Sequence, residues 1–410
     1  MRVLLSTYGG RGDVEPIVGL AVRLQELGAE VLVCGPEDCA DRLAEVDLPL
    51  KPIGFPVRSL LHGATPPAVE SVPQRAAELI AAQFEQLPAV AEGCDALVAT
   101  GLFPVAAGAQ SVAEKLRIRY VYGAYCPIYL PSPYQRPQPL PGRPVPPEVT
   151  DRQALNDLDV QNYNRLFGGP LNTHRAAIGL PHVDNVRDHV ITGHPWLAAD
   201  QILGPWQETP NLDVVQTGAW ILPDERPLPV DLAAFLDAGA PPVYVGFGSM
   251  PMRAPGAARL AIAAVRAHGH RVVLSRGWAD LALIDDADDC FAVGEVNHHA
   301  LFRRVAAVVH HGGAGTTTTA ARAGAPQVVV PQMADQPYWA GRVAELGIGV
   351  AHDGSTPTTE SLSAALEAAL TAATRARAND LAGTVRSDGA AVAARLLVDA
   401  IGEQTSALSA

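Results

Sequence analysis

Short apolar runs alternate with amphipathic stretches along most of the chain, an order typical of repeated strand–helix–strand units. The run at 2–7 suits a buried parallel strand, and a glycine-rich turn follows at 8–13. From Val14 onward, apolar residues recur at the spacing of one helix face, and Asp13 stands where an N-cap belongs. We expect the second strand at 30–34.

The same alternation returns in the second half of the chain. The strands expected there are 242–248, 271–275, 306–310 and 327–331, and the helices are 257–268 and 316–322. Two separate series in 410 residues predict an α/β fold with two doubly wound, Rossmann-like domains. The expected division is a first domain at 1–205, a linker at 206–229, a second domain at 230–385, and a C-terminal helix at 386–410 that could cross back to the first domain.

Composition and charge narrow the class of protein. A net charge of −13 argues against nucleic-acid binding, which depends on clustered Lys and Arg. No apolar run reaches the roughly 18 residues of a membrane span, and the amino terminus lacks a signal-peptide pattern. The five cysteines form no CxxC pair, so we expect neither zinc nor disulfides. We expect a cytoplasmic monomer.

Nine prolines lie between Pro127 and Pro147, and so many cannot continue a helix or a central strand. The segment is therefore predicted to be a long loop. Its aromatic residues, Tyr125, Tyr129 and Tyr134, favour contact with a ligand, here an acceptor substrate, over a purely solvated excursion, which is the alternative.

The segment His310–Thr317, with sequence HHGGAGTT, follows a predicted strand and opens a helix. Gly312, Gly313 and Gly315 let the backbone approach a ligand closely, and the helix start at Thr316 and Thr317 presents N–H groups to an anion. The lysine of an ATPase P-loop is missing, so a site that holds a diphosphate is indicated. Either His310 or His311 could be a ligand to it, or both could be packed strand residues.

Two further polar groups follow predicted strands. The segment 9–13 fails as a dinucleotide fingerprint, because Glu15 stands where the third glycine belongs. Asp13 either caps its helix or acts as a general base towards an incoming hydroxyl. Asp335 and Gln336 offer acceptors and donors in a compact patch that suits the hydroxyls of a sugar.

Weaker signals complete the predicted donor site. Arg11 and Ser249 could contact the diphosphate, and Arg276, Trp278 and Val296 could contact a base or ribose, although Trp278 could equally fill the core. The acidic run at 285–289 lies in a polar loop and is interpreted as a solvated turn, so no metal site is expected.

Together these motifs resemble the GT-B glycosyltransferases, in particular those of glycopeptide antibiotic biosynthesis (vancomycin, chloroeremomycin and teicoplanin type). The resemblance covers nearly the whole chain. It rests on the opening MRVLLSTYGGRGDVEPIVGLAVRLQELGAEV, SVAEKLRIRY, LNTHRAAIGLP, VQTGAWILPDERPL, VYVGFGS, VLSRGWADL and VVHHGGAGTTTTAARAGAPQVVVPQMADQPYWAGRVAELGIGVA.

The resemblance implies two Rossmann-like domains facing a central cleft, with the acceptor on the first and the nucleotide sugar on the second. It implies inversion at the anomeric carbon, with no metal and no cofactor, and with Asp13 as the base. The histidine–glycine loop and Ser249 match the family's diphosphate contacts, and Asp335 and Gln336 match the pair that holds hexose hydroxyls. Because both motifs are intact, UDP-glucose or UDP-N-acetylglucosamine is the expected donor, and a glycopeptide aglycone is the expected acceptor.

Three other functions compete with sugar transfer. A UDP-sugar epimerase on the same fold would need no acceptor, and the proline- and tyrosine-rich loop argues against it. A non-catalytic nucleotide-sugar sensor would not need Asp13 together with Asp335 and Gln336. An oxidoreductase is disfavoured by the broken dinucleotide fingerprint.

Overall fold

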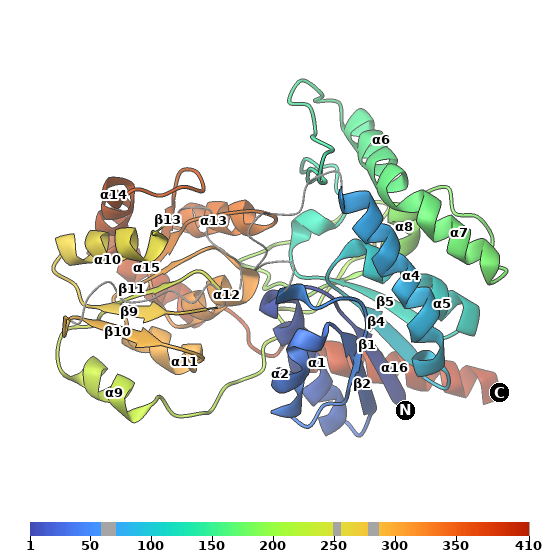
Figure 1. Cartoon of the computed structure of the whole chain (residues 1–410), viewed down its shortest axis with the longest axis horizontal. Coiled ribbons are helices and arrows are strands. Elements are labelled where there is room, and N and C mark those ends of the chain that lie inside the picture. Colours follow the sequence, from blue (N-terminus) through green and yellow to red (C-terminus); the bar gives the residue numbers. More distant parts are fainter. Residues whose placement is uncertain (59–70, 249–255, 278–286, 410) are drawn as a thin grey trace. The chain divides into compact units, whose positions relative to one another are not determined.

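The computed structural model describes residues 1–58, 71–248, 256–277 and 287–409. The chain forms two compact units. The first comprises Met1–Ala199, Trp206–Leu222 and Ser387–Ala410, and the second comprises Asp200–Pro205 and Pro223–Arg386. Figure 1 shows both, with the strands of each unit covered by helices.

The first unit is built on a parallel sheet, for which the described residues supply seven strands in the order β3-β2-β1-β4-β5-β6-β7. The strands are β1 (Arg2–Ser6), β2 (Glu30–Gly35), β3 (Leu50–Pro52), β4 (Ala96–Ala99), β5 (Arg119–Ala124), β6 (Trp196–Leu197) and β7 (Val215–Gln216). Val3, Leu4 and Leu5 of β1 are fully buried, so both faces of this strand are covered, as parallel sheets require.

Helices cover both faces of this sheet (Figure 1). The helical elements are α1 (Arg11–Glu26), η1 (Glu37–Cys39), α2 (Ala40–Ala44), α4 (Val72–Ala91), α5 (Phe103–Leu116), η3 (Pro127–Tyr129), α6 (Arg152–Tyr163), η4 (Asn164–Gly168), α7 (Gly169–Ala177), α8 (Val186–Ile191) and α16 (Gly389–Ser409). Leucines and valines of α1 share one hydrophobic core with α16, so the C-terminal helix belongs to the first unit.

The second unit contains a parallel sheet whose described strands follow the order β10-β9-β8-β11-β12-β13. They are β8 (Val243–Gly246), β9 (Val272–Ser275), β10 (Cys290–Val293), β11 (Ala307–His310), β12 (Gln327–Val329) and β13 (Gly349–Ala351). The helical elements are α9 (Val230–Asp237), α10 (Ala257–Ala267), α11 (His298–Leu301), η5 (Phe302–Arg304), α12 (Ala314–Arg322), α13 (Gln336–Glu345), α14 (Thr359–Ala369) and α15 (Ala372–Ala382). The expected fold class, two doubly wound α/β units, is confirmed.

The segment expected to be a linker, 206–229, is divided between the units. Residues 206–222 supply β7 and the buried Trp220 to the first unit, so only the residues from Pro223 onward leave it. Residues 200–205 go with the second unit, where the Arg342 guanidinium donates to the carbonyls of Ile202 at 2.8 Å and Leu203 at 3.0 Å.

Two helices begin earlier than their sequences suggest. Helix α1 begins at Arg11 with Gly10 as its N-cap, so the expectation that Asp13 caps it is wrong, and Asp13 is the third helical residue. Helix α12 begins at Ala314 with Gly313 as its N-cap. Glycine has no side chain with which to cap, so the first N–H groups of both helices have no side-chain cap.

The strand order reverses between β1 and β4 in the first sheet and between β8 and β11 in the second. Ligands of doubly wound folds bind outside the carboxyl ends of the strands at such reversal points. Asp13 lies in the first turn of the helix that follows β1, and the histidine–glycine segment joins β11 to α12, so the fold places both at favoured positions. None of the described helices is long and apolar enough to cross a membrane.

Candidate active site

Asp13 lies at the reversal point of the first sheet, in the first turn of α1. Its carboxylate packs against Gly9, where an added Cβ would stand 1.9 Å from Asp13 Oδ2. The Asp13 carbonyl accepts hydrogen bonds from the Thr7 hydroxyl at 3.2 Å and the Tyr125 hydroxyl at 3.1 Å. The backbone that carries the carboxylate is therefore fixed, and no residue larger than glycine fits at position 9 without displacing it.

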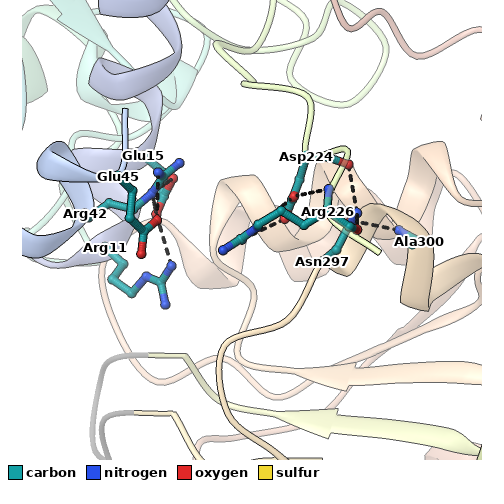
Figure 2. A network of polar contacts seen from close by, with 8 residues as sticks. All are labelled: Arg11, Glu15, Arg42, Glu45, Asp224, Arg226, Asn297 and Ala300. Atoms are coloured by element: carbon teal, nitrogen blue, oxygen red, sulfur yellow. Dashed lines mark hydrogen bonds and ion pairs between the residues drawn. The ribbon is translucent and has the colours of Figure 1, made fainter. Parts of the chain in front are cut away.

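Arg11 takes part in an ion-pair network with Glu15, Arg42 and Glu45 (Figure 2). Glu15 accepts from Arg11 at 3.1 Å and from Arg42 at 3.0 Å, and Arg42 also pairs with Glu45 at 3.2 Å. Burial by itself would raise the pKa of Glu15, but the hydrogen bonds and charges of Arg42 and Arg11 outweigh it and lower the pKa. The network orients the Arg11 guanidinium through Glu15. The contact of Arg11 with a diphosphate stays a prediction.

The three tyrosines predicted to contact an acceptor lie in different surroundings. Tyr125 points into the first unit, where its hydroxyl meets Thr100 Oγ1 at 2.8 Å and its ring meets Trp220 edge-on at 6.1 Å between centroids. It therefore supports the start of α1, and its contact with an acceptor stays a prediction. Tyr129 ends the 3₁₀ turn η3 and is partly buried, whereas Tyr134 is exposed beneath the Arg152 guanidinium.

The proline-rich segment forms a loop with a single 3₁₀ turn among its described residues, as its sequence predicts. The middle of the loop is tied to its C-terminal end, because the Arg136 guanidinium donates to the carbonyls of Pro146 and Val149, both at 2.8 Å.

The two adjacent histidines have different environments. His310 ends β11, is 0% exposed, and has both ring nitrogens engaged: Nδ1 accepts from the Gly312 N–H at 3.1 Å, and Nε2 donates to Gln327 Oε1 at 2.9 Å. Burial, and then His311, lowers the pKa of His310 to about 3, although the bond to Gln327 opposes this. The structure thus makes His310 a packed strand residue, which corrects its assignment as a diphosphate contact.

His311 lies in the short connection between β11 and α12. A Cβ at Gly313, the N-cap, would stand 2.7 Å from His311 Nε2, and one at Gly248 would stand 2.7 Å from Cε1. The two glycines thus leave room for the imidazole between them. Its Nδ1 is buried and has no hydrogen-bond partner among the described residues. Burial lowers the pKa of His311 to about 4, so the ring is neutral near neutral pH.

The glycines of this loop have distinct functions. Gly312 has φ +93°, and a Cβ there would stand 2.8 Å from Val329 Cγ1, so only glycine fits. Gly315 faces open space in the first turn of α12. The Thr317 hydroxyl donates back to the Gly313 carbonyl at 3.0 Å and is therefore already engaged. The donors that the first turn of α12 offers to an anion are its backbone N–H groups, including that of Thr316.

Asp335 and Gln336 begin α13, immediately after Ala334, which adopts a left-handed conformation at φ +53°. Asp335 Oδ2 accepts from the Trp339 indole at 2.8 Å. Gln336 Oε1 accepts from the N–H groups of Gln332 at 2.7 Å and Met333 at 3.1 Å. The pair is held rigidly, and a strained non-glycine residue beside it is typical of functional loops.

The residues predicted to contact the donor base follow β9 and β10, which are neighbours in the sheet. Arg276 is exposed and its N–H donates to the Val293 carbonyl at 3.0 Å, whereas Val296 is partly buried against a hydrophobic core. Trp278, Ser249 and residues 285–286 of the acidic run lie outside the described residues.

Sequence reasoning missed Asn297, which shapes the loop after β10 (Figure 2). Its side-chain amide donates to the carbonyls of Asp224 and Arg226, both at 2.8 Å, and its oxygen caps α11 by accepting from the Ala300 N–H at 3.0 Å. The signal that could have identified it is the N-cap position before His298.

Comparisons with known proteins agree with this architecture. Residues 3–134 match the glycosyltransferase family 28 N-terminal domain, and residues 262–395 match the erythromycin biosynthesis protein CIII-like C-terminal domain. Among solved structures, the glycosyltransferase of kitacinnamycin shares the fold with a TM-score of 0.71 and 20% identity, covering 97% of this chain and 98% of that one. Glycosyltransferase VinC in complex with dTDP shares it with a TM-score of 0.66 and 21% identity over 98% and 100% of the two chains. The fold and the site define a glycosyltransferase of the GT-B class.

Three curated proteins of Amycolatopsis orientalis match the chain over nearly its whole length. Glycosyltransferase GtfE is 62% identical and vancomycin aglycone glucosyltransferase 60% identical, each over 100% of both chains. dTDP-epi-vancosaminyltransferase is 51% identical over 98% of each. The chain belongs to the glycosyltransferases of glycopeptide antibiotic biosynthesis, as its motifs indicate. These relatives are named as transferases and give no support for the epimerase alternative.

The buried histidines make a prediction for the stability of the second unit. In the unfolded chain both histidines have the ordinary pKa of about 6.5. In the folded chain the pKa is about 4 for His311 and about 3 for His310. The two buried, neutral histidines therefore make their full contribution to the free energy of unfolding above about pH 6.5, and this contribution is lost progressively as the pH falls below 6.5. We expect the melting temperature to fall with decreasing pH below about 6.5.

Differential scanning calorimetry at several pH values measures this effect. His311→Asn should give a shallower pH dependence than the parent. An unchanged dependence in His311→Asn would contradict the prediction.

Proposed function

We propose that the protein transfers a hexose, glucose or N-acetylglucosamine, from a UDP-sugar to a hydroxyl of a glycopeptide aglycone. The observation that carries this proposal is the loop at 310–317, in which His311 and a glycine-capped helix start lie at the reversal point of the second sheet. N–H groups at a helix start, together with the helix dipole, bind diphosphate. The names of the vancomycin aglycone glucosyltransferase and its relatives support the choice of acceptor.

The proposed reaction is a direct displacement with inversion. Asp13 takes the proton of the acceptor hydroxyl, the oxygen forms a bond to the anomeric carbon, and the bond from that carbon to the diphosphate breaks. UDP leaves with the electron pair, and its negative charge is stabilised by the start of α12 and by His311. No metal and no cofactor enters this proposal.

The rigid pair Asp335 and Gln336 supports a hexose donor. A carboxylate and an amide fixed at the start of α13 suit hydrogen bonds to vicinal sugar hydroxyls, which a deoxygenated sugar would partly lack. The relative named for dTDP-epi-vancosamine makes dTDP-deoxysugars the donors to compare. Cytoplasmic location and a monomeric state stay predictions.

The test is incubation of the full chain with UDP- and dTDP-sugars and a panel of glycopeptide aglycones, followed by mass measurement. We expect the mass of one hexose to be added from UDP-glucose or UDP-N-acetylglucosamine. Transfer only from dTDP-deoxysugars would overturn the donor assignment, and transfer to no aglycone would overturn the acceptor assignment.

A further inference from the structure

The side chain of Gln327 contacts both ends of the histidine–glycine loop. Gln327 is the first residue of β12 and is fully buried. Its Oε1 accepts from His310 Nε2, at the beginning of the loop, at 2.9 Å, and its Nε2 donates to the Thr317 carbonyl, at the end of the loop, at 3.4 Å. The contacts continue through the ring, because His310 Nδ1 accepts from the Gly312 N–H at 3.1 Å. One buried amide and one buried ring thus join the end of β11 to the start of α12.

The two ends of this chain of hydrogen bonds fix the direction of every bond in it. The Thr317 carbonyl can only accept, and the Gly312 N–H can only donate. Gln327 must therefore turn its nitrogen to Thr317 and its oxygen to His310. Burial lowers the pKa of His310 to about 3, so the ring carries one proton near neutral pH, and that proton must lie on Nε2. Only this tautomer leaves Nδ1 bare to accept from Gly312.

The residues between these contacts are the ones assigned to the diphosphate, among them His311 and the N-cap Gly313. Gln327, His310 and Thr317 are all fully buried, so water does not replace a lost partner. A buried donor or acceptor without a partner is costly. If one link were broken, the loop would move to recover a partner, and its N–H groups would no longer converge on a diphosphate.

We propose that Gln327 is a positioning residue for the diphosphate loop, and that it acts through a single tautomer of His310, which holds the Gly312 N–H. The inference rests on the proposed function, because it takes the loop to bind the diphosphate of a nucleotide sugar. A loop fixed before binding loses little conformational freedom when the ligand arrives. Its donors also stay aligned while charge develops on the leaving diphosphate.

The substitution Gln327→Met tests this role. Methionine packs well in buried surroundings, but it offers no strong acceptor to His310 and no donor to Thr317. We expect UDP affinity, measured by calorimetry, to fall about tenfold, while the acceptor KM stays within about twofold. Asn172→Leu is the matched control in the first unit, because the Asn172 amide also pairs with a backbone carbonyl and a backbone N–H, both of Val183. It should leave UDP affinity unchanged.

The substitution Gln327→Glu makes the same chain of hydrogen bonds depend on pH. A protonated carboxyl reproduces the amide, since its O–H donates to the Thr317 carbonyl and its other oxygen accepts from His310. A carboxylate only accepts, so it would face the Thr317 carbonyl oxygen without a proton between them. Burial raises the pKa of such a carboxyl. We therefore expect the UDP affinity of this variant, relative to the parent, to fall as the pH rises from about 6 to about 9, and a constant ratio would contradict the proposal.

A double-mutant cycle tests whether the two side chains act as one unit. His310→Phe fills the space of the ring but removes both of its hydrogen bonds. We expect UDP affinity to fall about tenfold in His310→Phe and to fall little further when Gln327→Met is added, because each substitution breaks the same chain. Losses that multiply to about 100-fold in the double variant would show that the two residues act separately.

The tautomer of His310 can be observed directly by NMR of the full chain labelled with nitrogen-15 histidine. Two-bond correlations between ring protons and ring nitrogens distinguish the two tautomers, and the loss of signals in His310→Phe identifies those of His310. We expect the parent to carry this proton on Nε2 near neutral pH, and a proton on Nδ1 would overturn the proposal. If the parent binds neither UDP nor dTDP, the proposed function fails and the inference falls with it. If the parent binds UDP and Gln327→Met binds it equally well, the inference alone is wrong.

Discussion

Asp13→Asn is expected to lower the rate of sugar transfer by about 100-fold or more, because the amide cannot accept the proton of the acceptor hydroxyl. Asparagine has nearly the same shape as aspartate, so it should occupy the same space against Gly9. The KM values for donor and acceptor should change little. The measurement is kcat at saturating concentrations of both substrates.

Two controls sharpen this experiment. Asp41→Asn alters an exposed carboxylate in the first turn of α2 and should leave kcat unchanged. Asp13→Glu keeps a base but lengthens the side chain where Gly9 leaves no room, so it should retain only part of the activity. Turnover of Asp13→Asn within about twofold of the parent would remove the base assignment, given the loss expected of a general base.

The strands could be predicted from the sequence because the strands of a parallel sheet are buried on both faces. Continuous apolar runs such as 2–7 and 306–310 have few other interpretations when helical periodicity separates them. The first residues of the helices were harder to predict from the sequence. N-cap prediction relies on side chains that can accept hydrogen bonds, and both helices at the reversal points have glycine there instead.

The two adjacent histidines show a second limit of prediction from the sequence. Successive residues at a strand end point to opposite faces of the sheet, and the sequence does not say which of His310 and His311 is packed inside the protein. The answer comes from Gln327, 17 residues away on β12, whose side-chain oxygen accepts a hydrogen bond from the His310 ring. Such a pairing depends on how neighbouring strands are arranged in space, which local periodicity does not encode.

His311→Ala is expected to lower kcat by about 100- to 1000-fold, the usual range for removing one donor that stabilises developing negative charge. Its Nε2 lies beside Gly313, where the first turn of α12 opens. Charge develops on the diphosphate as the bond to the sugar breaks, so the loss should affect kcat more than donor KM. His270→Ala is the control, and kcat of His311→Ala within about twofold of the parent would exclude this role.

The protonation of His311 gives the same role an independent signature. Burial holds the pKa of the free ring at about 4, and a bound diphosphate would raise it, because negative charge favours the protonated form. A ligand that raises a pKa binds more tightly as the pH falls, so UDP affinity should rise as the pH is lowered from neutral towards about 4, the pKa of the free ring. His311→Gln retains a hydrogen-bond donor but cannot titrate. UDP affinity is measured by calorimetry across this pH range for the parent and for His311→Gln. Because UDP itself titrates equally in both experiments, the difference between the two affinities reports the titration of His311 alone. If this difference does not grow as the pH falls, the ring does not contact the diphosphate.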